Sequence, residues 1–384
     1  MKNVPIFHLS YSSSGGAGNI AKQLSSAQSD LGYESHLVTS SSANVSKHPL
    51  EHPAVSLAAI LDKFLLVKPG SQLFSVLRGK LQTLSRDSYQ AGSIIHLHWL
   101  PGAVSEFALS DLVDSGLKIV WTLHDYRPLT GGCHFTHGCK KFENGCNGCP
   151  QVSPWARPAI AKSHQRSMNR IKGRNITFVA PSRGLQLAAE NSSISAGSRV
   201  EFIPNPIRDF AKFSEKPARK ESNNLKNFLF VAANVKESRK GLAQVLSWWN
   251  LHRKLGQILT LIGANSESFS DSRHGITGLG VMSPEGVNRY MNDADVLLFG
   301  STEDNAPGVI AEAVLAGLPI FALDPKMQQW LSHEGTPLLK LKQLHSLESI
   351  KAFCSEELPD QSKQFIESRD SALVASKYLE LYFE

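Results

Sequence analysis

Two carboxylates in the second half of the chain are spaced so that both can reach one ligand. Asp304 and Glu312 lie in STEDNAPGVIAEAVLAGLP, with seven residues between them. Asp304 falls in a polar loop and Glu312 in the helical pattern that follows. Carboxylate oxygens accept hydrogen bonds well from vicinal hydroxyls, so a sugar or a ribose is the natural ligand. Glu303 can take the role of Asp304, and the alternative for Glu312 is a solvated residue favoured by the helix dipole.

Two cations stand just before another predicted helix. Arg239 and Lys240 follow the strand pattern NFLFVAAN and precede Gly241. Positive charge at a helix start is unfavourable unless an anion is bound there. The pair therefore indicates a diphosphate ligand, and a solvated surface pair is the alternative.

A glycine-rich turn follows the first predicted strand. In SSSGGAGNIAKQL, the small residues Gly15, Gly16 and Gly18 let backbone N–H groups and a helix N-terminus approach an anion. The spacing is not the G-x-G-x-x-G of dinucleotide-binding proteins. Phosphate binding and a plain tight turn are therefore equal alternatives.

A histidine and an aspartate end a buried strand. KIVWTLHD places His124 and Asp125 at the carboxyl end of the strand, where parallel sheets bind their ligands. A lone histidine is more often structural, but this position makes a catalytic His124 an equal alternative. His96 and His98 end the neighbouring strand IIHLHW, where we expect a mainly structural role.

Four of the five cysteines lie within one glycine-rich segment, at Cys133, Cys139, Cys146 and Cys149. In a reducing compartment such a cluster more often binds zinc than forms disulfides. A closed four-cysteine site would be structural, because a catalytic zinc needs an open position for water. Packed reduced thiols and disulfides are the alternatives. Cys354 lies in a helical pattern and is expected in the core.

The elements that must position these residues alternate between strand and helix. Short β-branched runs followed by helical patterns predict parallel sheets with helices on both faces. A stretch rich in Pro, Lys and Asn, residues 201–227, separates two such series. We therefore expect an α/β protein with two doubly wound sheets, joined by a linker and with a cleft between them.

The charge is uneven along the 384 residues. Residues 1–205 carry 20 Lys and Arg against 12 Asp and Glu, so the first half should meet an anionic partner. No apolar run approaches the ~20 residues that span a bilayer, and the N-terminus has the pattern of a strand and not of a signal peptide. These features predict a cytoplasmic protein.

A basic stripe is expected on one helix of the first half. Lys162, Arg166, Arg170 and Arg174 recur every four residues. A solvated face is one interpretation, and peripheral contact with an anionic membrane at its inner face is the other. The apolar helical segment SLAAILDKFLLVKPGSQLFSVLRGKLQTL would suit such an interface or a lipid-linked acceptor.

Together these motifs resemble a family-four retaining glycosyltransferase (glycosyltransferases group 1) of bacterial exopolysaccharide or colanic acid biosynthesis. The resemblance rests on SGGAGNIAKQL, WTLHDYRPLTGGCHF, VAPSRGL, IPNPI, SRKGL and TEDNAPGVIAEAVLAGLPIFA. It implies the GT-B fold, with two Rossmann-like domains facing a cleft. The acceptor-side domain would span 1–205 with its Cys-rich loop at 131–150, and the donor-binding domain 206–365. A C-terminal helix over 366–384 would pack back toward the first domain.

The resemblance also assigns roles on the donor side. Asp304 and Glu312 match the family's Glu-x7-Glu pair, which meets the donor sugar and the ribose, although Asp replaces the first Glu. Lys240 matches the lysine that holds the donor diphosphate, and Asn305 belongs to the same site. The arginine that many members place at the strand end is missing, and Arg239 stands in its place.

In the first half, His124 matches the histidine near the reacting sugar. Gly15 and Gly16 match the loop that faces the donor phosphates and the acceptor. His124, Asp304 and Lys240 are thus the expected catalytic residues.

The activity that the resemblance implies is that of a retaining hexosyltransferase (EC 2.4) without a catalytic metal or cofactor. Its donor would be a UDP- or GDP-hexose and its acceptor a saccharide or a lipid-linked saccharide. One alternative is a catalytically inactive GT-B relative that acts as a partner subunit. Another is a basic zinc-containing nucleic-acid-binding protein, but the basic residues lack the interleaved aromatics of such proteins.

Overall fold

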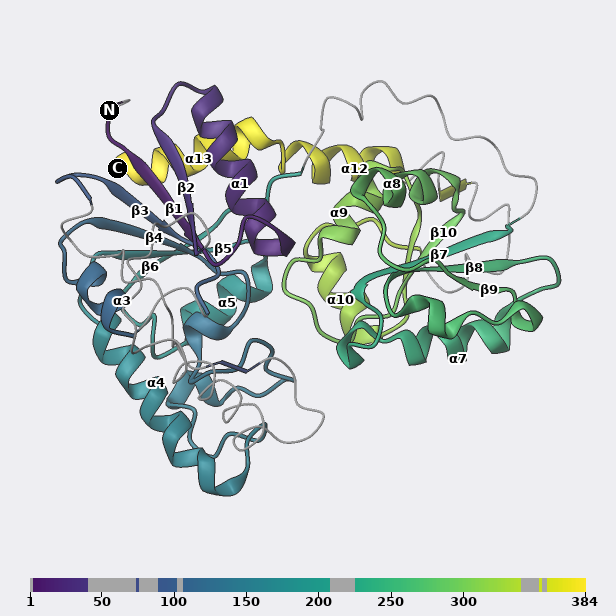
Figure 1. The fold of residues 1–384 in the computed structure, drawn as a ribbon, viewed down its shortest axis with the longest axis horizontal. Coiled ribbons are helices and arrows are strands. Elements are labelled where there is room, and N and C mark those ends of the chain that lie inside the picture. Colours follow the sequence, from purple (N-terminus) through teal and green to yellow (C-terminus); the bar gives the residue numbers. More distant parts are fainter. Residues whose placement is uncertain are drawn as a thin grey trace. The chain divides into compact units, whose positions relative to one another are not determined.

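The computed structural model describes residues 3–40, 74–75, 89–101, 106–207, 225–339, 352–353 and 358–384. The chain forms two compact units (Figure 1). One contains residues 1–206 and 371–384, and the other contains residues 207–370. The apolar segment expected at a membrane, apart from Phe74 and Ser75, lies outside the described residues, as do most of the expected linker and Cys354.

The first unit is built on a six-stranded parallel sheet in the order β2-β1-β3-β4-β5-β6. Its strands are β1 (Ile6–Ser10), β2 (Ser35–Thr39), β3 (Ile94–Leu97), β4 (Lys118–Thr122), β5 (Ile176–Ala180) and β6 (Arg199–Phe202). The inner strands β3, β4 and β5 are buried almost throughout, as parallel strands covered on both faces must be.

Helices cover both faces of this sheet. They are α1 (Gly15–Asp30), α3 (Glu106–Val113), α4 (Arg157–Ile171), α5 (Arg183–Asn191) and α13 (Ser371–Phe383). The helices α1 and α13 lie side by side over one face (Figure 1). Leu24, Val120 and Tyr378 belong to the core on this face. On the other face, Trp121 and Phe178 belong to the core that the helices α3, α4 and α5 cover. The last helix of the chain is thus part of the first unit.

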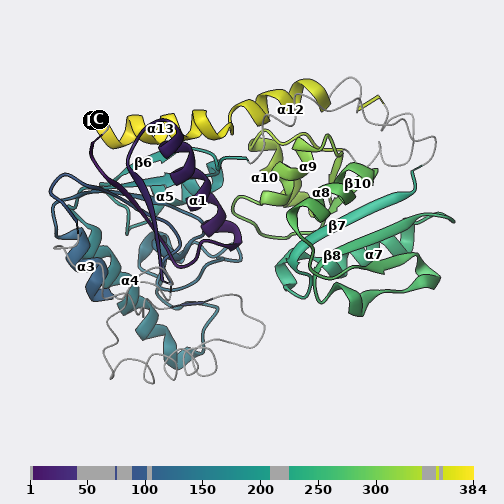
Figure 2. The ribbon, with the colours of Figure 1, turned by 45° about the horizontal axis from the view of Figure 1, so that its top comes forward.

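The second unit has a five-stranded parallel sheet in the order β11-β10-β7-β8-β9. Its strands are β7 (Asn227–Asn234), β8 (Ile258–Ala264), β9 (Ile276–Gly278), β10 (Val296–Phe299) and β11 (Ile320–Ala322). Its helices are α7 (Leu242–His252), α8 (Pro284–Asp293), α9 (Gly308–Leu315), α10 (Pro325–His333) and α12 (Leu358–Glu367). The helices α7 and α9 cover opposite faces of this sheet (Figure 2). Trp249 of α7 belongs to the core on one face, and Ile310 of α9 belongs to the core on the other.

The alternation of strand and helix in the sequence therefore predicted the architecture correctly: the structure has two parallel sheets, each with helices on both faces. The expected domain boundary fell at 205, and the two units divide after Pro206. Among the helices that the structure describes, none combines the length and apolar character needed to cross a membrane.

Candidate functional site

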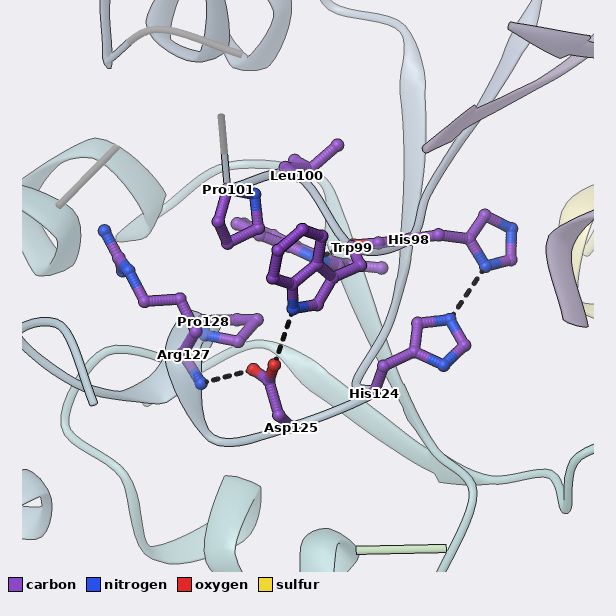
Figure 3. Close-up of a pocket in the computed structure, with 9 residues that line it drawn as sticks. His98, Trp99, Leu100, Pro101, His124, Asp125, Arg127 and Pro128 are labelled. Atoms are coloured by element: carbon purple, nitrogen blue, oxygen red, sulfur yellow. Dashed lines mark hydrogen bonds between the residues drawn. The ribbon is translucent and has the colours of Figure 1, made fainter. Parts of the chain in front are cut away.

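In the first unit the candidate residues gather where neighbouring strands end. Strands β1, β3 and β4 are adjacent and parallel, so the segments after them meet at one edge of the sheet. The Tyr11 N–H donates to the Trp99 carbonyl (2.9 Å). A small pocket at this edge is shown in Figure 3. It is lined by His98, Trp99, Leu100, Pro101, Trp121, His124, Asp125, Arg127 and Pro128.

His124 is held at this pocket as a neutral imidazole. Its Nε2 lies 3.0 Å from Nδ1 of His98 (Figure 3). Burial lowers the pKa of His124 from 6.5 to about 4, and the charge of Asp125 only partly opposes this shift. A neutral imidazole has one hydrogen-bond donor and one acceptor, so His124 can bind a hydroxyl at neutral pH without carrying charge.

Asp125, next to His124, is occupied by its own loop. One carboxylate oxygen accepts hydrogen bonds from Trp99 Nε1 (2.7 Å) and interacts with His134 Nδ1 (2.6 Å). The other accepts the Arg127 N–H (2.8 Å). Burial alone would raise the pKa of Asp125, but His134, Arg127 and Trp99 together lower it, so the carboxylate is ionised. The sequence indicated the His-Asp pair but not these partners, which lie two to twenty-six residues from Asp125.

The glycine-rich turn opens α1 as expected, and its glycines serve different needs. Gly15 has φ of +75°, in the left-handed region that favours glycine. A Cβ on Gly18 would lie 2.3 Å from the Ser12 carbonyl oxygen, so this position needs close backbone approach. Gly16 has open space around it. Gly15 and Gly16 are exposed at the first turn of α1, where backbone N–H groups can bind an anion.

In the second unit the expected donor-site residues form one charged cluster. Lys240 Nζ lies 2.6 Å from Asp304 Oδ2, and Arg239 Nη1 lies 3.4 Å from the same oxygen. Arg239 also pairs with Glu237 at 2.8 Å. The side chains of Arg239, Lys240 and Asp304 are only 10–15% exposed. The sequence predicted an anion beside Arg239 and Lys240, and in this structure that anion is the carboxylate of Asp304.

Backbone packing brings these two loops together. Lys240 ends the short 3-10 helix Ser238–Lys240 after β7, and Asp304 follows the adjacent strand β10. The Thr302 N–H donates to the Arg239 carbonyl (2.8 Å). Gly241 has φ of +70°, and a Cβ there would lie 1.8 Å from the Gly300 oxygen. Only glycine at 241 permits this contact.

The other donor-side candidates lie in the loop that carries Asp304 and on the helix that follows it. Asn305 is 4% exposed, and its N–H donates to Asp304 Oδ1 (3.0 Å). Glu312 lies in the second turn of α9 with an exposed side chain. The loop after β10 therefore carries Asp304 and Asn305, and the helix after it carries Glu312, as the sequence pattern predicted.

The cysteine segment forms a compact loop in the first unit. All four thiols are free, and Cys133, Cys146 and Cys149 are buried. Burial raises the pKa of the Cys133 thiol strongly and that of Cys146 to about 12, so both hold their protons. The Gly131 N–H donates to Cys146 Sγ (3.4 Å).

The fit of these thiols to a metal can be judged from their spacing. Among the described residues, His8, His96 and His98 are the metal-ligating groups that gather in a set of three, with ligand atoms within 4.8 Å of one another. The four cysteines of the loop do not form such a set. A zinc ion at Cys133, Cys139, Cys146 and Cys149 would have to draw the thiols together and displace their protons. Zinc there stays a prediction.

Of the expected basic stripe, Lys162, Arg166 and Arg170 lie on α4, whereas Arg174 follows the end of this helix. Lys162 and Arg166 are exposed. Arg170 donates to Ser110 Oγ (2.7 Å) and Arg174 pairs with Asp114 (2.6 Å), so both contact the α3 region of their own unit. The last two members of the stripe thus have partners within the protein, which neither the solvated-face nor the membrane interpretation predicted.

Comparison with known proteins gave two kinds of similarity. No family model matches the chain. The chain is 23% identical over 315 residues to the Escherichia coli (strain K12) protein WcaC, whose name assigns it to colanic acid biosynthesis as a glycosyl transferase. This alignment covers 75% of the chain and 74% of WcaC.

Solved structures share the whole fold at low identity. The glycosyltransferase WaaG of lipopolysaccharide biosynthesis superposes with a TM-score of 0.58 at 12% identity, covering 98% of this chain and 99% of WaaG. HepE from Anabaena, solved with UDP and glucose, gives 0.51 at 15% identity with 99% of each chain covered. Sucrose-phosphate synthase from Thermosynechococcus elongatus gives 0.54 at 14% identity, covering 99% and 98%. The GT-B fold expected from the motifs is confirmed.

Proposed function

We propose that this protein is a glycosyltransferase that moves a hexose from a nucleotide-sugar to a saccharide or lipid-linked acceptor in cell-surface polysaccharide biosynthesis. The similarity to WcaC and the fold shared with WaaG support the class of reaction. The observation that carries the proposal for the donor is the convergence of Arg239, Lys240 and Asp304 at the carboxyl ends of β7 and β10. Doubly wound sheets bind their ligands at such strand ends.

On the donor side, the chemistry is departure of a nucleoside diphosphate from the anomeric carbon. Negative charge develops on the leaving phosphate, and preorganised cations stabilise it best where water is excluded. Lys240 and Arg239 are largely buried and fixed by their ion pairs, so they fit this role. When a diphosphate replaces Asp304 as the partner of Lys240, the carboxylate becomes available to sugar hydroxyls. Glu312 then binds the ribose.

In the first unit, His124 takes the hydroxyls of the reacting sugar as a neutral imidazole. Transfer in the retaining sense leaves the new bond on the same face of the sugar as the old one. All the charge stabilisation needed by this scheme comes from side chains and helix N-termini, so the proposal includes no catalytic metal. UDP is the first donor nucleotide to test, because HepE was solved with UDP.

The cellular place that we propose is the cytoplasm, with peripheral contact at the inner face of the membrane. The exposed Lys162 and Arg166 on α4 support this contact. Binding to vesicles of anionic lipid should weaken as salt rises, because exposed charges are screened. Binding that salt leaves unchanged, or none at all, would contradict the membrane contact.

The experiment that tests the function is calorimetric titration of the protein with UDP and with GDP, without divalent metal. We expect micromolar binding of one nucleotide, weakened in Lys240→Ala and Glu312→Ala. The exposed Lys254, at the opposite end of the sheet before β8, provides the control variant Lys254→Ala. If neither nucleotide binds, the proposed donor site is wrong.

One observation favours a second candidate function. Asp304 replaces the family's glutamate and already neutralises Lys240. An inactive relative that serves as a partner subunit would bind the nucleotide but transfer no sugar. Turnover of the nucleotide-sugar whose nucleotide binds in the titration separates the two functions.

A further inference from the structure

Four histidines lie together beneath the helices α1 and α13. His8 is on β1, His96 on β3 and His98 directly after it, and His124 follows β4. The first three are at most 2% exposed. The rings of His96 and His98 stack with centroids 4.2 Å apart, which places these two side chains on one face of the sheet.

A continuous hydrogen-bond chain runs from α1 to His124. Gln28 Oε1 lies 2.8 Å from His8 Nε2. His8 Nδ1 lies 3.0 Å from His98 Nε2. His98 Nδ1 in turn lies 3.0 Å from His124 Nε2, the contact drawn in Figure 3. Gln28, which is fully buried, is thus linked to the catalytic candidate through two imidazoles.

A second arm starts from the same glutamine. Gln28 Nε2 donates to the Tyr382 hydroxyl of α13 (3.3 Å). This hydroxyl also contacts His96 Nδ1, and His96 Nε2 lies 2.7 Å from Thr122 Oγ1. The orientation of one side-chain amide therefore affects both arms.

A metal ion is the first alternative for three histidines whose ring nitrogens lie within 4.8 Å of one another. Bound zinc would lie about 2.0–2.1 Å from each ligating ring nitrogen, and it would displace the hydrogen bonds that these nitrogens make. In this cluster both ring nitrogens of His8, His96 and His98 already have a partner. The hydrogen-bond chain accounts for the arrangement without an ion.

The donor in each contact follows from simple chemistry. A carboxamide oxygen only accepts, so His8 Nε2 must carry the hydrogen that it shares with Gln28. Because a neutral imidazole has a single N–H, His8 Nδ1 then accepts from His98 Nε2–H. By the same step, His98 Nδ1 accepts from His124 Nε2–H. The hydrogen of His124 is therefore on Nε2, and its lone pair is on Nδ1.

We propose that Gln28 and His8 are positioning residues that act through His98 to hold His124 in the tautomer with its hydrogen on Nε2. In this tautomer Nδ1 is the acceptor nitrogen of the His124 ring. This role rests on the proposed function. Reversal of the Gln28 amide would reverse the direction of every hydrogen bond from Gln28 to His124 and put the hydrogen of His124 on Nδ1. In the orientation seen, Gln28 Nε2 donates to the Tyr382 hydroxyl and Gln28 Oε1 accepts from Ser35 Oγ (3.1 Å).

The test is a ring-nitrogen NMR spectrum of the histidine-labelled whole protein at neutral pH, with His124 assigned by its loss in His124→Gln. We expect the Nε2–H tautomer for His8, His98 and His124. A wild-type His124 with its hydrogen on Nδ1 would overturn the proposal. This measurement is made without a nucleotide-sugar, so its outcome is separate from that of the nucleotide titration.

Two variants test the path to His124. Tyr382→Phe and Gln28→Leu, neither of which alters a group in contact with His124, should each populate the Nδ1–H tautomer of His124. Ser25→Ala is the matched control, because Ser25 is on the same helix and bonds to Ser35 as Gln28 does. An unchanged His124 tautomer in both variants would overturn the positioning role. If Gln28→Leu does not fold, Tyr382→Phe and the wild-type spectrum decide.

Two further readouts separate positioning from other roles. With a donor available, kcat of Tyr382→Phe should fall in proportion to the fraction of His124 in the Nδ1–H tautomer, while KM for the donor stays unchanged. A fall in stability with kcat per folded molecule unchanged would contradict positioning. One zinc per chain that disappears in His8→Gln would likewise replace the hydrogen-bond chain with a metal site.

Discussion

Lys240 Nζ lies 2.6 Å from Asp304 Oδ2, and both side chains are mostly buried. The family resemblance assigns these residues to different parts of the donor, the lysine to the diphosphate and the acid to the sugar. Their contact means that Lys240 is already neutralised before any donor binds. A diphosphate must therefore compete with Asp304 for the same cation.

Replacement of the lysine tests its action on the leaving group. We expect Lys240→Ala to lower kcat by about 10²–10³, the loss typical when one preorganised donor to a developing anion is removed. The free energy of unfolding should change less than the activation free energy of transfer, because Arg239 remains near Asp304 (3.4 Å). Initial rates and the melting temperature check the two parts. Wild-type rates in Lys240→Ala would exclude this role, and Lys254→Ala should behave as wild type in both assays.

Replacement of the acid separates competition from catalysis. Asp304→Asn removes the charge that holds Lys240, so we expect nucleotide binding to tighten by several-fold while sugar transfer falls. Asp304→Glu introduces the acid found at this position in the family that the sequence resembles, and it should retain both properties. Calorimetry with the bare nucleotide and rates with the nucleotide-sugar measure the two effects. Weaker nucleotide binding in Asp304→Asn would show that Asp304 supports the diphosphate site and does not compete for it.

The strand ends were the part of the site that the sequence could predict. The alternation of strands and helices predicted the parallel sheets. In a parallel sheet the residues that follow the strands, such as His124, Lys240 and Asp304, lie at the edge formed by the carboxyl ends of the strands. To predict the contact between Lys240 and Asp304 we would also have needed to know that β7 and β10 are neighbours in the sheet and that Gly241 packs closely against Gly300. These depend on packing between strands that are distant in sequence.

The histidine chain could not be predicted from the sequence for the same reason. His8 and His98 are 90 residues apart, and Gln28 and Tyr382 are 354 apart. The alternation IIHLHW indicated only that two histidines share a strand. Their partners depend on the pairing of β1 with β3 and on α13 packing against α1, which local patterns do not encode.

The cysteine loop gives a prediction about metal content. Protein purified under reducing conditions should contain one zinc per chain, because zinc can displace thiol protons and closed four-cysteine sites are structural. Cys146→Ser should lose the metal and destabilise the loop, whereas Cys354→Ser should keep it. Elemental analysis measures this. A metal-free wild type with four titratable thiols in the loop would instead establish packed reduced cysteines.

The buried histidines predict how stability depends on pH. Burial lowers the pKa of both His8 and His124 to about 4, below the 6.5 of an exposed histidine. Between these values the unfolded chain binds more protons than the folded one, so stability is full above pH 6.5 and falls as the pH drops toward 4. At pH 5 each of the two histidines should cost about 2 kcal/mol relative to neutral pH.

Urea unfolding at pH 7 and pH 5 measures this loss. His8→Gln removes one of the buried titrating groups, so the difference between the two pH values should shrink by about 2 kcal/mol. The exposed His333 provides the control, and His333→Gln should keep the wild-type difference. Carboxylates also titrate below pH 5, and they are common to all three proteins. An equal pH dependence in His8→Gln and wild type would mean that His8 is not buried as a neutral group, and the hydrogen-bond chain to His124 would then lose its first imidazole.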